Sequence, residues 1–226
     1  IVSNVNTSIS SVLLPSLSQC QDTPERVRHM LRRAMQISSF VMWPLMVGLA
    51  VIADSLVPFL LTEKWLPLVP YLQVFCFSYA LWPIHTTNLN GINAMGRSDI
   101  FLKLEIIKKT YGLLMLFLMI PHGPFAMCCG ALVTGIVSTF VNSYPNRKLL
   151  GYHYLAQIRD IAPSALLAIA MGGVIYPIAW LELGNLVTMC FQTIVGMIFY
   201  FVFAYLFHLD AFAYIVETVC ALRHKA

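Results

Sequence analysis

The chain has 226 residues, of which 59% are hydrophobic and 11% are charged, and its mean hydropathy is +0.76. A soluble globular domain carries roughly 25% charged residues, so this composition excludes an ordinary soluble domain and indicates a membrane-embedded protein. The formal net charge of +4 does not predict nucleic-acid binding, because the basic residues form short clusters between apolar segments instead of one continuous stripe.

Long apolar segments follow one another along the chain as candidate transmembrane helices, each of which needs about 20 mostly apolar residues. The predicted spans are a partial helix over 1–17 and full helices over 37–61, 66–95, 100–120, 125–144, 161–181 and 183–207. Prolines interrupt the span over 66–95, and the segment 121–124 forms a short turn. The tail over 211–223 places its apolar residues on one helical face, which predicts a helix on the membrane surface.

The lysine and arginine residues lie almost entirely on one side of these spans. When the spans are threaded in alternating directions, thirteen of the fourteen Lys and Arg residues share one face. Basic loops stay in the cytoplasm, so we predict a multi-pass inner-membrane protein with a cytoplasmic C-terminus. The loops expected inside surround Arg28, Arg97 and Arg147, and the residues expected outside are Lys64, His122 and Glu182.

The predicted fold is therefore an all-α polytopic membrane protein with about six full transmembrane helices, one partial helix and a C-terminal surface helix. A basic loop is predicted over 18–33. The connections between the spans are short, so sequential helices are expected to be antiparallel neighbours. The chain opens without a Met inside an apolar segment, and we expect it to be a fragment of a longer protein.

Small and weakly polar residues recur every four positions in two of the spans. The first ridge consists of Ala126, Gly130, Thr134, Ser138 and Asn142, and the second consists of Ser164, Ala168 and Gly172. Small residues let helix backbones approach closely inside a bilayer. The ridges predict helix packing, with cavity lining as the alternative, and Asn142 is the member expected to contact a substrate.

The second half of the span over 66–95 is unusually polar, with His85 and Asn88 at its centre. Polar groups at membrane depth must be satisfied by protein or by water in a cavity. Two interpretations stay open for this segment: hydrogen bonding between helices, and the lining of a hydrophilic passage.

Lys108 and Lys109 lie about two turns inside the span over 100–120. Glu105 stands three and four residues before them and can pair with only one. The other lysine either extends its side chain to the cytoplasmic headgroups or faces a water-filled cavity, where it would meet an anionic phosphate.

Sequence motifs of enzymes are missing. The chain contains no glycine-rich phosphate loop, no metal-spaced His/Cys set, no nucleophile elbow and no carboxylate pair at catalytic spacing. We expect no enzyme, no catalytic residue, no metal and no cofactor.

A series of short segments over 13–99 carries a family resemblance. The segments are Leu14-Pro15-Ser16-Leu17-Ser18, Asp22 with Glu25 and Arg26, Pro44-Leu45, Gly48-Leu49, Leu60-Leu61 to Trp65, and Asn93-Ala94-Met95-Gly96-Arg97. In this order they resemble the C-terminal half of the lipid-linked polysaccharide (O-antigen and exopolysaccharide) flippases of the multidrug/oligosaccharidyl-lipid/polysaccharide exporter superfamily. That family usually has a glycine shortly before the tryptophan, where this chain has Thr62, Glu63 and Lys64.

The resemblance implies a transporter with two six-helix lobes around a central cavity. It implies that 1–145 is part of the C-terminal lobe, that 146–226 adds two further helices and the interfacial tail, and that an N-terminal lobe is missing. The implied substrate is an undecaprenyl-pyrophosphate-linked oligosaccharide that crosses from the cytoplasmic to the outer leaflet, with membrane lipids as the other partner. Its candidate binding residues are Lys108, Lys109, His85, Asn88 and Asn142.

Other functions stay open on the sequence alone. A drug/cation antiporter of the same superfamily would need an acidic residue deep in a span, for which Asp54 is the candidate. A polytopic membrane enzyme acting on lipid-linked sugars would need a catalytic carboxylate or histidine at a membrane face. A noncatalytic scaffold of a polysaccharide assembly complex is a third possibility.

Overall fold

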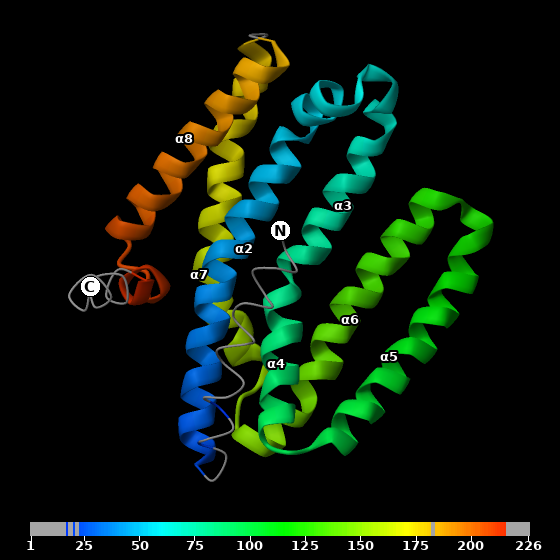
Figure 1. Cartoon of the computed structure of the whole chain (residues 1–226), viewed down its shortest axis with the longest axis vertical. Helices are drawn as coiled ribbons and strands as arrows, with labels where there is room; N and C mark the ends of the chain where they lie inside the picture. The colour runs from blue at the N-terminus through cyan, green and yellow to red at the C-terminus, as the bar shows by residue number, and fades with distance from the viewer. Residues whose placement is uncertain (1–16, 18–19, 21–22, 182–183, 216–226) are drawn as a thin grey trace. The chain divides into compact units, whose positions relative to one another are not determined.

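A computed structural model describes residues 17, 20, 23–181 and 184–215 of the chain. This part is helical and contains no strand (Figure 1). The elements in chain order are α2 (Pro24–Leu61), η1 (Glu63–Leu68), α3 (Val69–Ala80), α4 (Trp82–Ala94), α5 (Ser98–Met119), η2 (Ile120–His122), α6 (Pro124–Leu150), α7 (Tyr154–Ile175), η3 (Tyr176–Leu181) and α8 (Asn185–Leu206). The predicted partial span over 1–17, the outer residue Glu182 and the tail beyond 215 lie outside the described residues, apart from Leu17.

Five helical segments are long and apolar enough to cross a membrane. They are Pro24–Leu61, Glu63–Ala94, Pro124–Leu150, Tyr154–Leu181 and Asn185–Leu206. The sixth predicted span is α5, which has 22 residues and is therefore about 33 Å long, enough for a hydrocarbon core of about 30 Å. Its four charged side chains between 103 and 109 distinguish it from the other five segments. The all-α polytopic membrane fold is confirmed.

Several helices extend beyond the ends that hydropathy predicts. The arginines predicted in the loop over 18–33 lie on α2, which begins at Pro24, and the basic residues after 144 lie on α6, which continues to Leu150. Proline is favourable in the first turn of a helix, and Arg and Lys are good helix formers. Gly151 then ends α6 with a left-handed φ of 63°. Hydropathy marks where the bilayer ends, whereas caps decide where the helix ends.

The predicted break in the third apolar segment is confirmed. Leu81 separates α3 from α4, and Pro83 is the second residue of α4. The predicted turn over 121–124 is confirmed as well, because η2 is followed by Gly123 with a φ of 91°, after which Pro124 begins α6. Glycine adopts this φ without steric cost.

The chain divides into two compact units, one made of 1–38 and 78–160 and the other of 39–77 and 161–226. Both units contain residues from either side of position 145, and the predicted division of the chain there stays a prediction.

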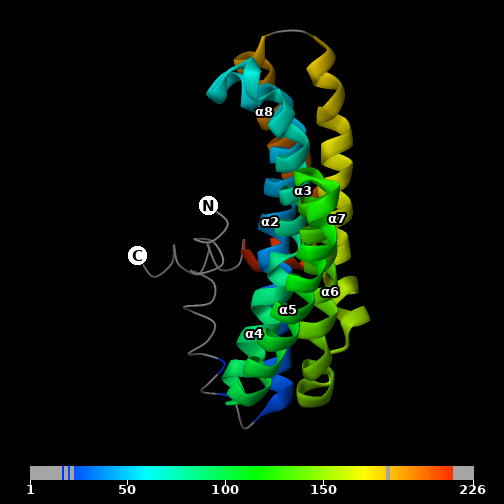
Figure 2. The same ribbon diagram turned by 90° about the vertical axis from the view of Figure 1, so that its right-hand side faces the viewer.

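In the first unit, α5 and α6 form an antiparallel hairpin, and α4 packs on α6 (Figures 1 and 2). A Cβ added to Gly130 would lie 2.8 Å from Met119 Cγ, and Thr134 Cγ2 would lie 3.8 Å from a Cβ on Gly112. The first ridge therefore packs against α5 along this part of its length, as predicted.

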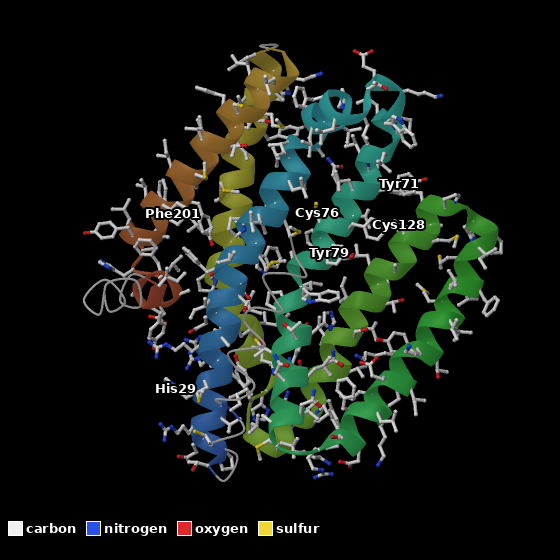
Figure 3. The ribbon with its side chains drawn as sticks, viewed as in Figure 1. His29, Tyr71, Cys76, Tyr79, Cys128 and Phe201 are labelled. Carbon is white, nitrogen blue, oxygen red and sulfur yellow. The ribbon has the colours of Figure 1, made fainter. Side chains whose placement is uncertain are left out.

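In the second unit, the α7 ridge packs against α2. A Cβ on Gly172 would lie 2.7 Å from Val47 Cγ1, and Ala168 is completely buried. The Tyr200 hydroxyl of α8 donates a 2.9 Å hydrogen bond to the Phe40 carbonyl, within an aromatic cluster that also contains Phe201 (Figure 3). The second ridge is thus also a packing surface.

Candidate functional site

Three of the five predicted binding residues converge where α4, α5 and α6 meet. Asn142 Nδ2 of α6 lies 3.1 Å from His85 Nδ1 of α4, and the Lys108 side chain of α5 is largely buried, at 16% exposure. A hydrogen bond between Tyr111 and Ser138 sets the register of α5 and α6. Because these helices are antiparallel, one turn from that bond brings Lys108 to the level of Asn142.

The imidazole of His85 contacts the carboxamide of Asn142 across the α4–α6 interface. Which of its two nitrogens carries the hydrogen depends on the tautomer of the ring. The ring packs edge to face on Trp82, which in turn contacts Tyr79 at the end of α3 (Figure 3). Asn142 is completely buried, and its Oδ1 has no hydrogen-bond partner among the described residues.

The two adjacent lysines of α5 differ in their surroundings. Lys108 Nζ lies 2.5 Å from Glu105 Oε1, and the side chains of the pair are 16% and 31% exposed. The predicted pairing of Glu105 with one lysine is therefore confirmed. Lys109 is exposed, as expected for a residue that points about 100° away from its neighbour on a helix. Lys108 is the lysine that reaches the junction of the three helices.

Asn88 does not join this group. It is 1% exposed, and its Nδ2 donates to the Ile84 carbonyl at 2.8 Å and to Gln157 Oε1 at 2.7 Å, with Ser143 Oγ at 3.3 Å. Its Oδ1 accepts from Asn146 Nδ2 at 2.7 Å and Gln157 Nε2 at 3.0 Å. Protein groups saturate this amide, so the structure supports hydrogen bonding between helices at this position.

A second oxygen on α6, Asn146 Oδ1, is also buried without a hydrogen-bond partner in the described part of the chain. It faces Gly91 of α4, where an added Cβ would lie 3.4 Å away. The glycine lets the two helices approach and offers this oxygen a Cα hydrogen, which is a weak donor. Asn142 Oδ1 has no comparable neighbour described, which makes it the unexplained polar group of this interface.

Sequence reasoning missed a buried carboxylate near the start of α7. Asp160 accepts from Arg32 Nε at 2.8 Å, from Tyr152 Oη at 2.8 Å and from Gln36 Nε2 at 3.4 Å. It is 8% exposed. Burial and the adjacent carboxylate raise the pKa of the Tyr152 hydroxyl. Asp160 thus connects α2, the segment between α6 and α7, and α7 itself.

The sequence contains one signal for this cluster. Asp160 is an acid at the edge of an apolar run in a basic region, and an arginine-rich segment precedes the first complete span. Asp54, the acid that the sequence favoured, is exposed on α2. Within the described ranges, no group of three or more His, Cys, Asp or Glu side chains could hold a metal ion.

Comparison with known proteins finds relatives that match parts of the chain. Residues 1–70 match the model of a family described as "Polysaccharide biosynthesis protein". The chain is 26% identical over 166 residues to the lipopolysaccharide biosynthesis protein WzxC of Escherichia coli K12, covering 70% of the chain and 32% of that protein. It is 27% identical over 176 residues to the teichuronic acid biosynthesis protein TuaB of Bacillus subtilis 168, covering 76% of the chain and 36% of that protein.

An uncharacterized membrane protein from the cps region of Klebsiella pneumoniae is 29% identical over 106 residues, covering 47% of the chain and 22% of that protein. The chain thus spans about a third of the length of these relatives, or less. Its fold is similar to that of the lipid II flippase MurJ in an inward closed conformation. The TM-score is 0.76 at 17% identity, covering 92% of the chain and 44% of MurJ.

Proposed function

We propose that this chain, which belongs to the multidrug/oligosaccharidyl-lipid/polysaccharide exporter superfamily, forms one lobe of a transporter for undecaprenyl-pyrophosphate-linked oligosaccharide. The transporter moves this lipid from the cytoplasmic to the outer leaflet of the bacterial inner membrane. The arrangement of His85, Lys108 and Asn142 where α4, α5 and α6 meet is the observation that carries the proposal. It supplies a cation and hydrogen-bonding groups at membrane depth, where an anionic sugar-phosphate headgroup has to cross.

The chemistry of the headgroup fits these residues. A pyrophosphate offers only hydrogen-bond acceptors and negative charge, for which an ammonium group is a natural ligand. Lys108 is held by Glu105 in a partly buried position, so its charge is positioned before the substrate arrives. An intramembrane ionisable residue with one accessible side is a functional candidate by default. Lys109 is exposed on the same helix and serves either the headgroup or membrane orientation.

The whole transporter needs a second lobe. In the proposed mechanism, this lobe and an N-terminal lobe enclose a hydrated cavity that opens alternately to the two sides, while the polyprenyl tail stays in the bilayer. The distribution of Lys and Arg supports cytoplasmic placement of the C-terminus.

The acidic residues weigh against a drug/cation antiporter. Glu105 is paired with Lys108, Asp160 is paired with Arg32, and Asp54 is exposed. A carrier of organic cations requires a carboxylate that is buried and available to its ligand, and none of these three has both properties.

The test uses the full-length transporter in cells whose polysaccharide export depends on it. Lys108→Ala should abolish export at an unchanged membrane level, whereas Lys108→Arg should retain part of it because the charge is kept. Lys103→Ala, at an exposed position of the same helix, is the control and should export normally. The double variant Lys108→Ala with Glu105→Gln removes the carboxylate that the single change leaves unpaired.

Export restored by that double variant would show that Lys108 acts only by neutralising Glu105. Normal export by Lys108→Ala would refute the headgroup site and leave the lysine as an orientation signal.

A further inference from the structure

Two aromatic side chains extend the proposed headgroup site along the third span. Tyr79 is near the end of α3, and Trp82 is the first residue of α4. The ring centroid of Trp82 lies 6.3 Å from that of His85, in an edge-to-face arrangement, and 5.6 Å from that of Tyr79. Tyr79 and Trp82 form a continuous surface, which we call the aromatic shelf. It borders the histidine that contacts Asn142.

The depth of the aromatic shelf is unusual for these residue types. α3 and α4 together run from Val69 to Ala94, and both shelf residues stand near the middle of that stretch. Tryptophan and tyrosine are enriched at the membrane surfaces, where the ring lies in apolar surroundings and the polar tip meets water. From the midplane, each edge of the hydrocarbon core is about 15 Å away, which is beyond the length of either side chain. Anchoring at a membrane surface therefore does not account for the shelf.

Both shelf residues also keep exposed polar tips. Tyr79 and Trp82 are each 39% exposed. Among the described residues, none bonds the Tyr79 hydroxyl and none accepts a hydrogen bond from the indole N–H of Trp82. In hydrocarbon these two groups would stay unsatisfied, which is costly. The exposed side of the shelf is therefore suited to a hydrated space or to a polar ligand.

We propose that the aromatic shelf binds the sugar that is attached directly to the pyrophosphate. This inference rests on the proposed function and names the residues that contact the glycan part of the same substrate. A pyranose ring has an apolar C–H face, whose slightly positive hydrogens attract the negative face of an aromatic ring. Its edge carries hydroxyl groups, which can bond the indole N–H and the phenol hydroxyl. Tryptophan beside tyrosine offers both kinds of contact.

The spacing of the two parts of the site fits a sugar phosphate. A phosphate beside Lys108 and Asn142 would be next to the imidazole of His85, and the ring of Trp82 follows 6.3 Å further along α4. A single oxygen joins the sugar to the phosphate, so each can contact its own side chains at the same time. The prenyl chain is the other candidate occupant. It has no hydroxyl groups and would leave the polar tips of the shelf unsatisfied.

Binding to the purified full-length transporter in lipid nanodiscs tests this inference. One probe is farnesyl-diphospho-N-acetylglucosamine, and the other is the same diphosphate diester with a methyl group in place of the sugar. The two probes have the same charge and the same prenyl chain, so the ratio of their affinities measures the contribution of the sugar. We expect the wild type to prefer the sugar probe by about five- to tenfold. Trp82→Leu should reduce this preference below about twofold and leave the affinity for the methyl probe unchanged.

Trp65→Leu is the matched control, because Trp65 is an exposed tryptophan of η1 outside the shelf, and it should keep the full preference. Equal affinity of the wild type for the two probes would overturn this inference and leave the proposed function standing. A full preference in Trp82→Leu would overturn the assignment to the shelf. Equal weakening of both probes by Trp82→Leu would assign the ring to the prenyl chain or to protein packing, against this inference. A wild type that binds neither probe would overturn the proposed function, and the inference with it.

A second measurement does not depend on the stability of Trp82→Leu. Transporter labelled with 5-fluorotryptophan gives a fluorine resonance for Trp82, which is assigned by its absence from the spectrum of Trp82→Phe. Saturating sugar probe should shift this resonance further than saturating methyl probe does, because only the sugar contacts the ring. A resonance that responds equally to both probes, or to neither, would contradict a sugar bound on Trp82.

Discussion

The Asp160 cluster gives a quantitative prediction about stability. Asp160 receives hydrogen bonds from Arg32, Tyr152 and Gln36, which belong to α2 and to the segment before α7. Asp160→Ala removes the shared acceptor and leaves the other three side chains in place. The cost depends on whether each of these groups can find water after the change.

The three partners contribute unequally. Removing one member of a fully buried ion pair costs about 3–5 kcal/mol. The Arg32 side chain is 54% exposed, however, and water can hydrate it after the change. The loss of the Arg32–Asp160 pair should therefore cost about 1 kcal/mol or less, as for a surface pair. Tyr152 is 1% exposed, and its hydroxyl would keep only the Met35 thioether at 3.7 Å, which is a weak acceptor. We assign about 1–3 kcal/mol to this loss. With Gln36 in addition, Asp160→Ala should destabilise the protein by about 3 kcal/mol.

Thermal unfolding of the detergent-purified protein measures this cost. At about 2–4 °C per kcal/mol for a chain of this size, Asp160→Ala should lower the melting temperature by roughly 6–12 °C. Tyr152→Phe removes one donor and should cost less, about 1–2 kcal/mol. Asp54→Ala, at an exposed acid of α2, is the control, with an effect within about 0.5 kcal/mol. If the melting temperature of Asp160→Ala equals that of the Asp54→Ala control, the cluster does not hold these segments together.

Two further predictions concern topology and packing. The topology test uses single cysteines in a cysteine-free background and an impermeant thiol reagent. The reagent should label Lys64→Cys in intact cells and Arg28→Cys only after permeabilisation, because basic segments stay in the cytoplasm. The reverse labelling pattern would refute the predicted orientation. Adjacent glycines of α7 form a matched pair. A Cβ at Gly172 would lie 2.7 Å from a valine of α2, whereas a Cβ at Gly173 would have no side chain of another described residue within 4 Å. Gly172→Ala should cost about 1–3 kcal/mol, and Gly173→Ala should be neutral or stabilising by up to about 1 kcal/mol; equal melting temperatures would contradict the packing of the α7 ridge.

Periodicity was sufficient to predict much of this fold. Apolar runs of membrane length gave the helices, and four-residue spacing gave both packing ridges, because an interface between two helices repeats along each of them separately. Each of these patterns can be read within one segment. The helix ends could not be read in this way, since α2 and α6 continue through charged residues beyond the apolar core.

Pairings between distant segments were beyond the reach of the sequence. Arg32 and Asp160 are 128 positions apart, and no local pattern indicates which arginine meets which carboxylate. Gln157 lay in a segment predicted as a loop, yet it is completely buried and bridges Asn88 and Ser143. A residue assigned to a loop is expected to be hydrated. Because the predicted span began at 161 and α7 begins at Tyr154, the sequence provided no indication that Gln157 belongs to the buried hydrogen-bond network.

The two asparagines that the sequence proposed as ligands show how the structure separates packing from function. Asn88 and Asn142 are both buried and both face the interface of α4 and α6. Every polar group of the Asn88 amide has protein partners, and moving it would break several bonds at once. Asn142 has one partner, a titratable ring, and an oxygen for which the described residues provide no donor. An unpaired buried acceptor costs about 1–3 kcal/mol, and a fold that only had to pack would do better with an apolar residue there. That cost favours Asn142 over Asn88 as a ligand of the proposed headgroup.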